Sequence, residues 1–465
     1  MKRQRLTWVL AVALITAAIG NASIAAVRSA RIDSYGAQPE SGAQPESGVA
    51  PDPRRPPDGG SVLVYDRDYP FIHYSDPPVH NDIARLQTRI DDGSVKLTST
   101  PQHGYLEGIL KALNIDPDSQ TLVFSKTSLQ VDAISAATPR AIYFNDDTYV
   151  AWVQKTGSLE IVTMDADRGP VFYTIAAADS RPHLERQALR CLTCHDSYSE
   201  MGGGVPRFLF ESTYAVDRGK LIPDAVARET ADETPIAERW GGWYVTGQDG
   251  GALHLGNIQP PGTPAPVAFD KVRRGSLASL DSLLDTSPYL RSTSDIVALL
   301  VLEHQVTVHN LIIRANYKSR MLLTRFSPKA DVAGLHWAQL PPELQSRLDQ
   351  LLAPVVDGLM LRDAAPLPDK VVGSNGYAAW FQAQGPKDPQ GRSLRELDLH
   401  SRVFRYPLSF LIYSEGFDAL PLFVREHLYE QLAHKLRTTA AGQSAFDILK
   451  ATKPEFAQDL RTLRD

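Results

Sequence analysis

The sequence predicts an α+β fold, with a β-rich middle region and a helical C-terminal half. In the middle region, short runs of β-branched and aromatic residues are separated by turn residues at 145–147 and 155–157, which is typical of an antiparallel sheet. From Ser276 onward, apolar residues recur at helical spacing, and the longest such stretch covers residues 294–317. The predicted strands cover residues 121–124, 141–144, 150–153, 159–164 and 171–175.

Shorter patterns complete the expected order of elements. Two helices should precede the sheet, over residues 83–90 and 105–113, because their apolar residues repeat every three or four positions. Strand-like runs also occur at 207–214 and 239–246. The remaining predicted helices cover residues 181–190, 342–360, 420–436 and 446–451.

Composition limits the class of protein. The chain has 465 residues, of which 43% are hydrophobic and 22% charged, as in a globular protein with a substantial core. The net charge of −6 argues against a nucleic-acid partner, since nucleic-acid-binding proteins are usually basic. We expect a mixed α/β region over residues 61–275 and a mainly helical region over residues 276–465.

The first 26 residues have the layout of a secretory signal peptide. Basic residues precede a mostly apolar stretch over 6–19, and small residues follow it. A membrane span needs about 20 apolar residues, so a cleaved signal is favoured over an N-terminal anchor. Residues 27–60 contain a direct repeat and many prolines and glycines, which predicts a disordered linker. We therefore expect an exported, periplasmic protein, either soluble or tethered to the inner membrane through its N-terminus.

Cys191, Cys194 and His195 form a C-x-x-C-H run that contains both cysteines of the chain. This run is the attachment signature of covalent haem, in which each thiol forms a thioether and the histidine binds the iron. A redox dithiol and half of a zinc site are the alternatives. The zinc site fails because no second cysteine pair exists, and export favours haem over the dithiol. We expect one haem c on Cys191 and Cys194, with His195 as the proximal iron ligand.

A second histidine is the expected sixth ligand, because methionine is scarce. His254 lies in a glycine-flanked loop and is the first candidate, ahead of His304 and His309 in the long predicted helix. For each of them, an ordinary structural histidine is the alternative. A six-coordinate iron follows from this hypothesis. Candidates for binding the haem propionates are Arg207, Arg239, Arg273 and Arg274.

Residues 185–206 resemble the c-type cytochromes through this motif. In that family, a proline about as far downstream as Pro206 presents its carbonyl to the proximal histidine, so the resemblance implies this role for Pro206. The motif is specific for covalent haem but not for a fold. Small members of the family carry it near the N-terminus of an all-helical domain, whereas here it lies mid-chain among β-rich segments. In this respect the chain is similar to large bacterial exported proteins that contain a cytochrome c domain.

Two functions follow from a single covalent haem. The first is electron transfer to a redox partner protein. The alternative is a haem-dependent oxidoreductase, peroxidase-like or a small-molecule oxidase, with an open or displaceable distal iron position. The size of the chain around one haem favours the enzyme, while the single motif argues against a di-haem peroxidase. Whether the protein is an enzyme stays open at this point.

Overall fold

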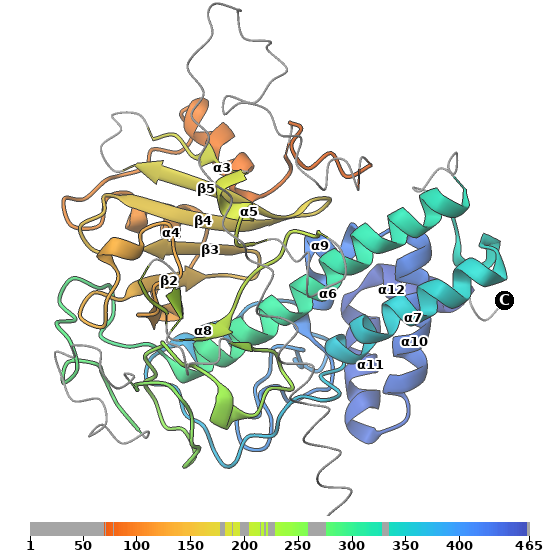
Figure 1. Cartoon of the computed structure of the whole chain (residues 1–465). Coiled ribbons are helices and arrows are strands. Elements are labelled where there is room, and N and C mark those ends of the chain that lie inside the picture. Colours follow the sequence, from red (N-terminus) through yellow and green to blue (C-terminus); the bar gives the residue numbers. More distant parts are fainter. Residues whose placement is uncertain are drawn as a thin grey trace, which may run out of the picture. The chain divides into compact units, whose positions relative to one another are not determined.

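An antiparallel sheet of six strands occupies the middle of the chain in the computed structural model (Figure 1). Neighbouring strands in the sheet are consecutive in the sequence, so the sheet is a simple meander. The strands are β1 (Thr121–Val123), β2 (Arg140–Phe144), β3 (Thr148–Trp152), β4 (Ser158–Asp165), β5 (Gly169–Ala176) and β6 (Glu185–Arg186).

The structure describes residues 69, 71–77, 79–176, 182–187, 189–195, 204–213, 215–217, 220–221, 228–258, 276–327 and 334–462. All of them belong to one unit, Val62–Asp465. The predicted signal segment and linker lie outside the described residues.

Helices precede the sheet and make up most of the described chain after residue 295. Between α5 and α6 in the sequence, two short ribbons form, β7 (Glu211–Ser212) with β10 (Arg228–Glu229) and β8 (Ala215–Asp217) with β9 (Lys220–Leu221). The helices are α3 (Asp82–Asp91), α4 (Leu106–Ala112), α5 (Leu189–Leu192), α6 (Ile296–Phe326), α7 (Pro342–Leu359), α8 (Tyr377–Ala383), α9 (Glu415–Asp418), α10 (Leu422–Leu436), α11 (Ala440–Thr452) and α12 (Pro454–Thr462).

Both faces of the sheet are buried because strand residues alternate between two cores. Tyr143 and Val150 belong to a core shared with α3 and α4, whereas Phe144 and Tyr149 belong to a larger core shared with α6. This arrangement explains why the strands are apolar on both faces. The larger core also includes residues of α7, α10, α11 and α12, so the regions 61–275 and 276–465 share one interior.

Helix α6 joins the sheet to the C-terminal helices (Figure 1). It begins after Asp295, whose carboxylate accepts hydrogen bonds from the amides of Val297 (2.8 Å) and Ala298 (3.0 Å), as an N-cap residue does. Among the described segments, it alone is long and apolar enough to cross a membrane, but 89% of its most apolar window is buried inside the protein. Its apolar composition is accounted for by its place in the core.

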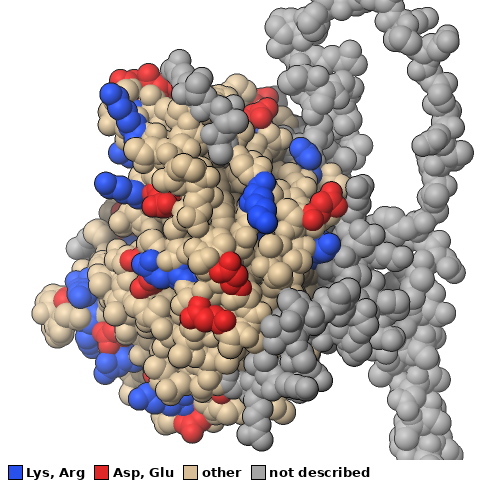
Figure 2. All heavy atoms as spheres, turned by 90° about the vertical axis from the view of Figure 1, so that its left-hand side faces the viewer, with Lys and Arg blue, Asp and Glu red and all other residues tan. Residues whose placement is uncertain are grey.

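On the face shown in Figure 2, acidic and basic side chains are interspersed.

The α+β class, the five predicted strands and all but one of the predicted helices are confirmed. The helix expected over residues 181–190 is wrong in its first half. Glu185 and Arg186 pair instead with Thr174 and Tyr173 at the open edge of β5, and among the described residues of this region only those of Leu189–Leu192 are helical.

The strand expected over residues 239–246 does not form. Trp240 and Gly242 have φ angles of 67° and 83°, which break an extended strand. A Cβ on Gly242 would lie 2.3 Å from the carbonyl oxygen of Thr213, so only glycine fits this close approach.

Candidate functional site

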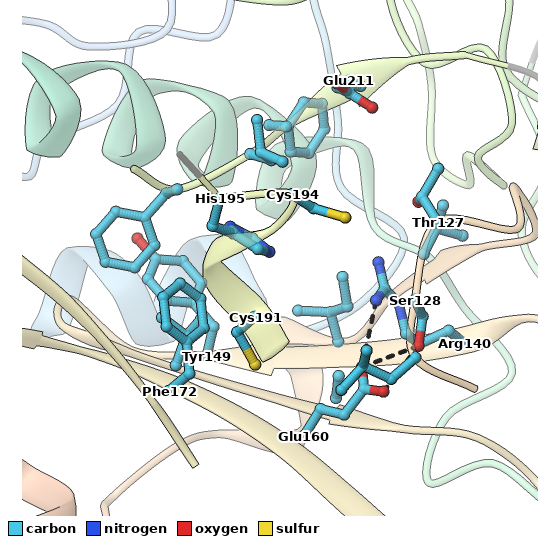
Figure 3. Close-up of a pocket in the computed structure, with 18 of the residues that line it drawn as sticks. Thr127, Ser128, Arg140, Tyr149, Glu160, Phe172, Cys191, Cys194, His195 and Glu211 are labelled. Carbon is cyan, nitrogen blue, oxygen red and sulfur yellow. Dashed lines mark hydrogen bonds and ion pairs between the residues drawn. The ribbon is translucent and has the colours of Figure 1, made fainter. Parts of the chain in front are cut away.

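The C-x-x-C-H run forms one helical turn at the end of α5. The backbone amides of Cys194 and His195 both donate to the carbonyl of Cys191, at 3.2 and 3.1 Å. This turn brings the two thiols and the imidazole to the same cavity (Figure 3). Cys191 is half-buried, Cys194 is exposed, and both are free thiols.

Two hydrogen bonds join His195 to the backbone of Arg207, one from the His195 side chain and one to the His195 carbonyl. Its Nδ1 donates to the carbonyl of Arg207 at 3.0 Å, and the amide of Arg207 donates to the carbonyl of His195 at 2.9 Å. The ring also lies against Phe172, with 4.7 Å between centroids.

The acceptor for His195 is therefore the carbonyl of Arg207, one residue beyond the predicted Pro206. Pro206 is buried next to it. The displacement has a physical reason, because the return bond to the His195 carbonyl requires a backbone N–H, which proline lacks.

The protonation state of His195 suits a metal ligand. Burial, together with the positive charges of Arg140 and Arg207, lowers the pKa of His195 to about 4, although its bond to the Arg207 carbonyl opposes the shift. The imidazole is therefore neutral at pH 7. Because Nδ1 carries the proton donated to Arg207, Nε2 keeps a lone pair that could bind a metal ion.

The cavity beside the motif has a volume of about 500 Å³, within the range of small-molecule and cofactor pockets. Its walls come from β2 to β5, the loop 123–131, the segment 207–213 and two residues of α6. Apolar lining residues include Val123, Ile142, Val162, Phe172, Phe208, Phe210, Trp243, Leu302 and Val306. Apolar walls, two thiols and a neutral imidazole form a set that fits a covalently bound haem.

Charged side chains lie on the wall formed by β2 and β4 (Figure 3). Arg140 pairs with Glu160 at 3.6 Å, and the hydroxyl of Ser128 is 2.9 Å from both carboxylate oxygens of Glu160. Lys126, Arg190 and Arg207 also line the cavity. These cations could bind the carboxylates of a porphyrin.

The thiol of Cys191 is not activated. Burial raises its pKa to about 12, and the negative charge of Glu160 adds to the shift. A redox dithiol depends on a thiolate with a lowered pKa. Cys191 therefore lacks the lowered pKa that the attacking thiol of a redox dithiol has.

The histidines expected as sixth ligand do not line this cavity. His254 is buried beside Trp240 and accepts a hydrogen bond from the amide of Gly256 at 3.0 Å. Both ring nitrogens of His304 are engaged, by Asp232 and Ser409 at 2.7 Å each, and His309 bonds the carbonyl of Asp146 at 2.8 Å. These three histidines are core residues with structural partners.

Other predicted candidates have mixed outcomes. Arg207 lines the cavity, whereas Arg239 pairs with the buried Glu303 at 3.1 Å. Arg273 and Arg274 lie outside the described residues. In the described part of the lining, His195 is the only histidine and methionine is absent.

Sequence reasoning missed Arg140, Glu160 and Ser128, which lie more than 30 residues before the motif. One signal was present. Glu160 interrupts the apolar run 159–164, and a charged residue inside a buried strand needs a partner.

The chain matches no protein-family model, and no curated protein or solved structure is significantly similar to it.

Proposed function

We propose that the chain is an exported monohaem c-type cytochrome. Cys191 and Cys194 would hold haem c through thioethers, and His195 would bind the iron. The observation that carries the proposal is the joint position of both thiols and a neutral imidazole at one cavity of about 500 Å³. When bound, the haem would supply one-electron redox chemistry.

The chain's own residues have distinct roles in this proposal. The Arg207 carbonyl orients His195, as second-shell acceptors do for ligating histidines. The apolar walls would shield a bound ring from water, which would favour the less charged ferrous form. The cationic side chains of the cavity wall would neutralise the propionates.

A second candidate is a haem-dependent oxidoreductase that acts on a small molecule. The described lining of the cavity offers no second histidine and no methionine to occupy the distal position. The pair of Arg140 and Glu160, which lines the cavity, could hydrogen-bond a small polar ligand. For either function, the N-terminal segment supports export, with a membrane tether as the alternative to a cleaved signal.

The pyridine haemochrome spectrum of the purified protein tests the first claim, and one haem c per chain is the expected result. Protein expressed in a host that attaches haem c, yet purified without haem, would contradict it. The spectrum of the ferric protein then separates the two functions. A low-spin spectrum favours electron transfer, while a high-spin spectrum favours the oxidoreductase.

A further inference from the structure

We propose that Asn310, on helix α6, is a positioning residue for His195 that tunes the reduction potential of the haem. The inference rests on the proposed function and concerns a residue 115 positions after His195 in the sequence. No motif connects the two residues; the connection is a chain of hydrogen bonds.

The peptide group between Arg207 and Phe208 lies at the centre of this chain. Its carbonyl oxygen, that of Arg207, accepts from Nδ1 of His195 at 3.0 Å. Its N–H, that of Phe208, donates to Oδ1 of Asn310 at 2.9 Å. A peptide group is planar, so fixing the direction of the N–H also fixes the direction of the carbonyl.

A second bond makes the contact of Asn310 bidentate. Its Nδ2 donates to the carbonyl of Phe208 at 3.0 Å. Arg207 is held independently, since its Nη1 pairs with Glu229 at 2.8 Å. The acceptor of His195 is thus fixed from α6 through the main chain and from Glu229 through the Arg207 side chain.

The burial of Asn310 argues against a role in helix packing alone. It is 8% exposed, one turn after Val306, which lines the cavity. An asparagine amide in this core helix costs free energy unless it is hydrogen-bonded, and leucine would bury more apolar surface. Both polar atoms of the amide instead bond the main chain of the segment that holds His195.

The chain of bonds has an electronic consequence. Hydrogen bonds in series polarise one another. When Asn310 accepts a hydrogen bond from the N–H of Phe208, the carbonyl of the same peptide group, that of Arg207, becomes a stronger acceptor. A stronger acceptor draws the Nδ1 proton of His195 and increases the basicity of Nε2. A more basic ligand stabilises ferric over ferrous iron, so Asn310 should lower the reduction potential.

Asn316 provides a matched control on the same helix. It is also buried, at 3% exposed, and its Nδ2 donates to the carbonyl of Asp167 at 3.0 Å. Its Oδ1 accepts from Nε of Arg320 at 2.7 Å, and it does not line the cavity. Replacing it removes a comparable pair of bonds without touching the segment of Arg207.

The test uses the haem-loaded full chain with the variants Asn310→Leu, Asn310→Ser and Asn316→Leu. Midpoint potential, the iron–histidine stretching frequency of the ferrous protein and the thermal midpoint are measured for each. Both Asn310 variants should shift the reduction equilibrium at least about threefold toward the ferrous form, or about 28 mV at 59 mV per tenfold, and lower the stretching frequency. Asn316→Leu should lower the thermal midpoint but leave potential and frequency at their wild-type values. Asn310→Ser, the smaller change, keeps the test valid if Asn310→Leu does not fold.

Potentials of the Asn310 variants that equal those of wild type, or that shift no more than Asn316→Leu, would overturn this inference alone. Wild-type protein without covalent haem would overturn the proposed function, and this inference with it.

Discussion

His195 is the residue on which the site depends, because its Nδ1 is engaged by the Arg207 carbonyl and its Nε2 is left for a metal. We expect His195→Ala to retain covalently attached haem, since both thiols remain, but to change the visible spectrum and the potential. The spectrum of the purified variant, recorded beside a haem stain of the denatured protein, checks both statements. Loss of the stain, or a wild-type spectrum, would contradict the assigned role.

Asp147 should make stability depend on pH. Burial raises the pKa of Asp147 to about 8, and the negative charges of Asp146, Asp82 and Glu415 add to the shift. Between pH 4 and 8 the carboxyl group of Asp147 is ionised in the unfolded chain but keeps its proton in the folded chain. The contribution of Asp147 to the free energy of unfolding is therefore fully present at low pH and is lost as the pH rises to 8.

Asp147→Asn should therefore raise the free energy of unfolding at pH 7 and have no such effect near pH 4. We expect a gain of about 1 kcal/mol, which is modest because part of the Asp147 side chain stays in contact with water. Urea unfolding across this pH range measures the difference. The exposed Asp363→Asn is the control. A difference that does not change with pH would count against this account.

At the residue scale, the sequence is sufficient for the local part of the site. Cys191, Cys194 and His195 belong to one run, so their proximity needs no tertiary information. The acceptor for His195 was displaced by one residue, since the path of the returning chain depends on which backbone group has an N–H to donate. Asn310 and Glu160 could not be predicted, because their role depends on how a helix and a strand pack around the motif.

Among the elements, α6 connects the sheet to the C-terminal helices through the larger core. Its contribution to stability can be tested at its first turn. Asp295 caps the helix through the amides of Val297 and Ala298. We expect Asp295→Ala to lower the free energy of unfolding by about 2 kcal/mol, and Asp295→Asn to cost less because asparagine also caps. Urea unfolding of the two variants measures this order. An Asp295→Ala variant as stable as the wild type would show that the cap contributes little.

The element scale also shows where sequence patterns succeed and fail. Strands β2 to β5 were predictable because alternation and turn residues are local signals. The region 181–190 was misassigned because its residues form helices readily, while the open edge of β5 offers backbone partners that the sequence does not reveal. Trp240, which has a positive φ, is buried and its Nε1 donates to Glu303 at 3.1 Å, a long-range partner that a local pattern does not reveal.

For the whole molecule, the cavity lined by the sheet and α6 would determine the chemistry of a bound haem. Its described lining has His195 as the only histidine and no methionine, so we expect the ferrous protein to bind carbon monoxide promptly. Optical titration of the reduced protein measures this. Failure to bind would indicate a strong sixth ligand from outside the described lining and would favour pure electron transfer.

The central claim is that this chain holds haem through two thioethers. Haem staining of the denatured full-length protein on a gel, beside the double variant Cys191→Ala/Cys194→Ala, tests it most directly. The account predicts a stained wild-type band and an unstained variant band at equal protein. A colourless wild type, or a double variant that stains as strongly, would contradict it.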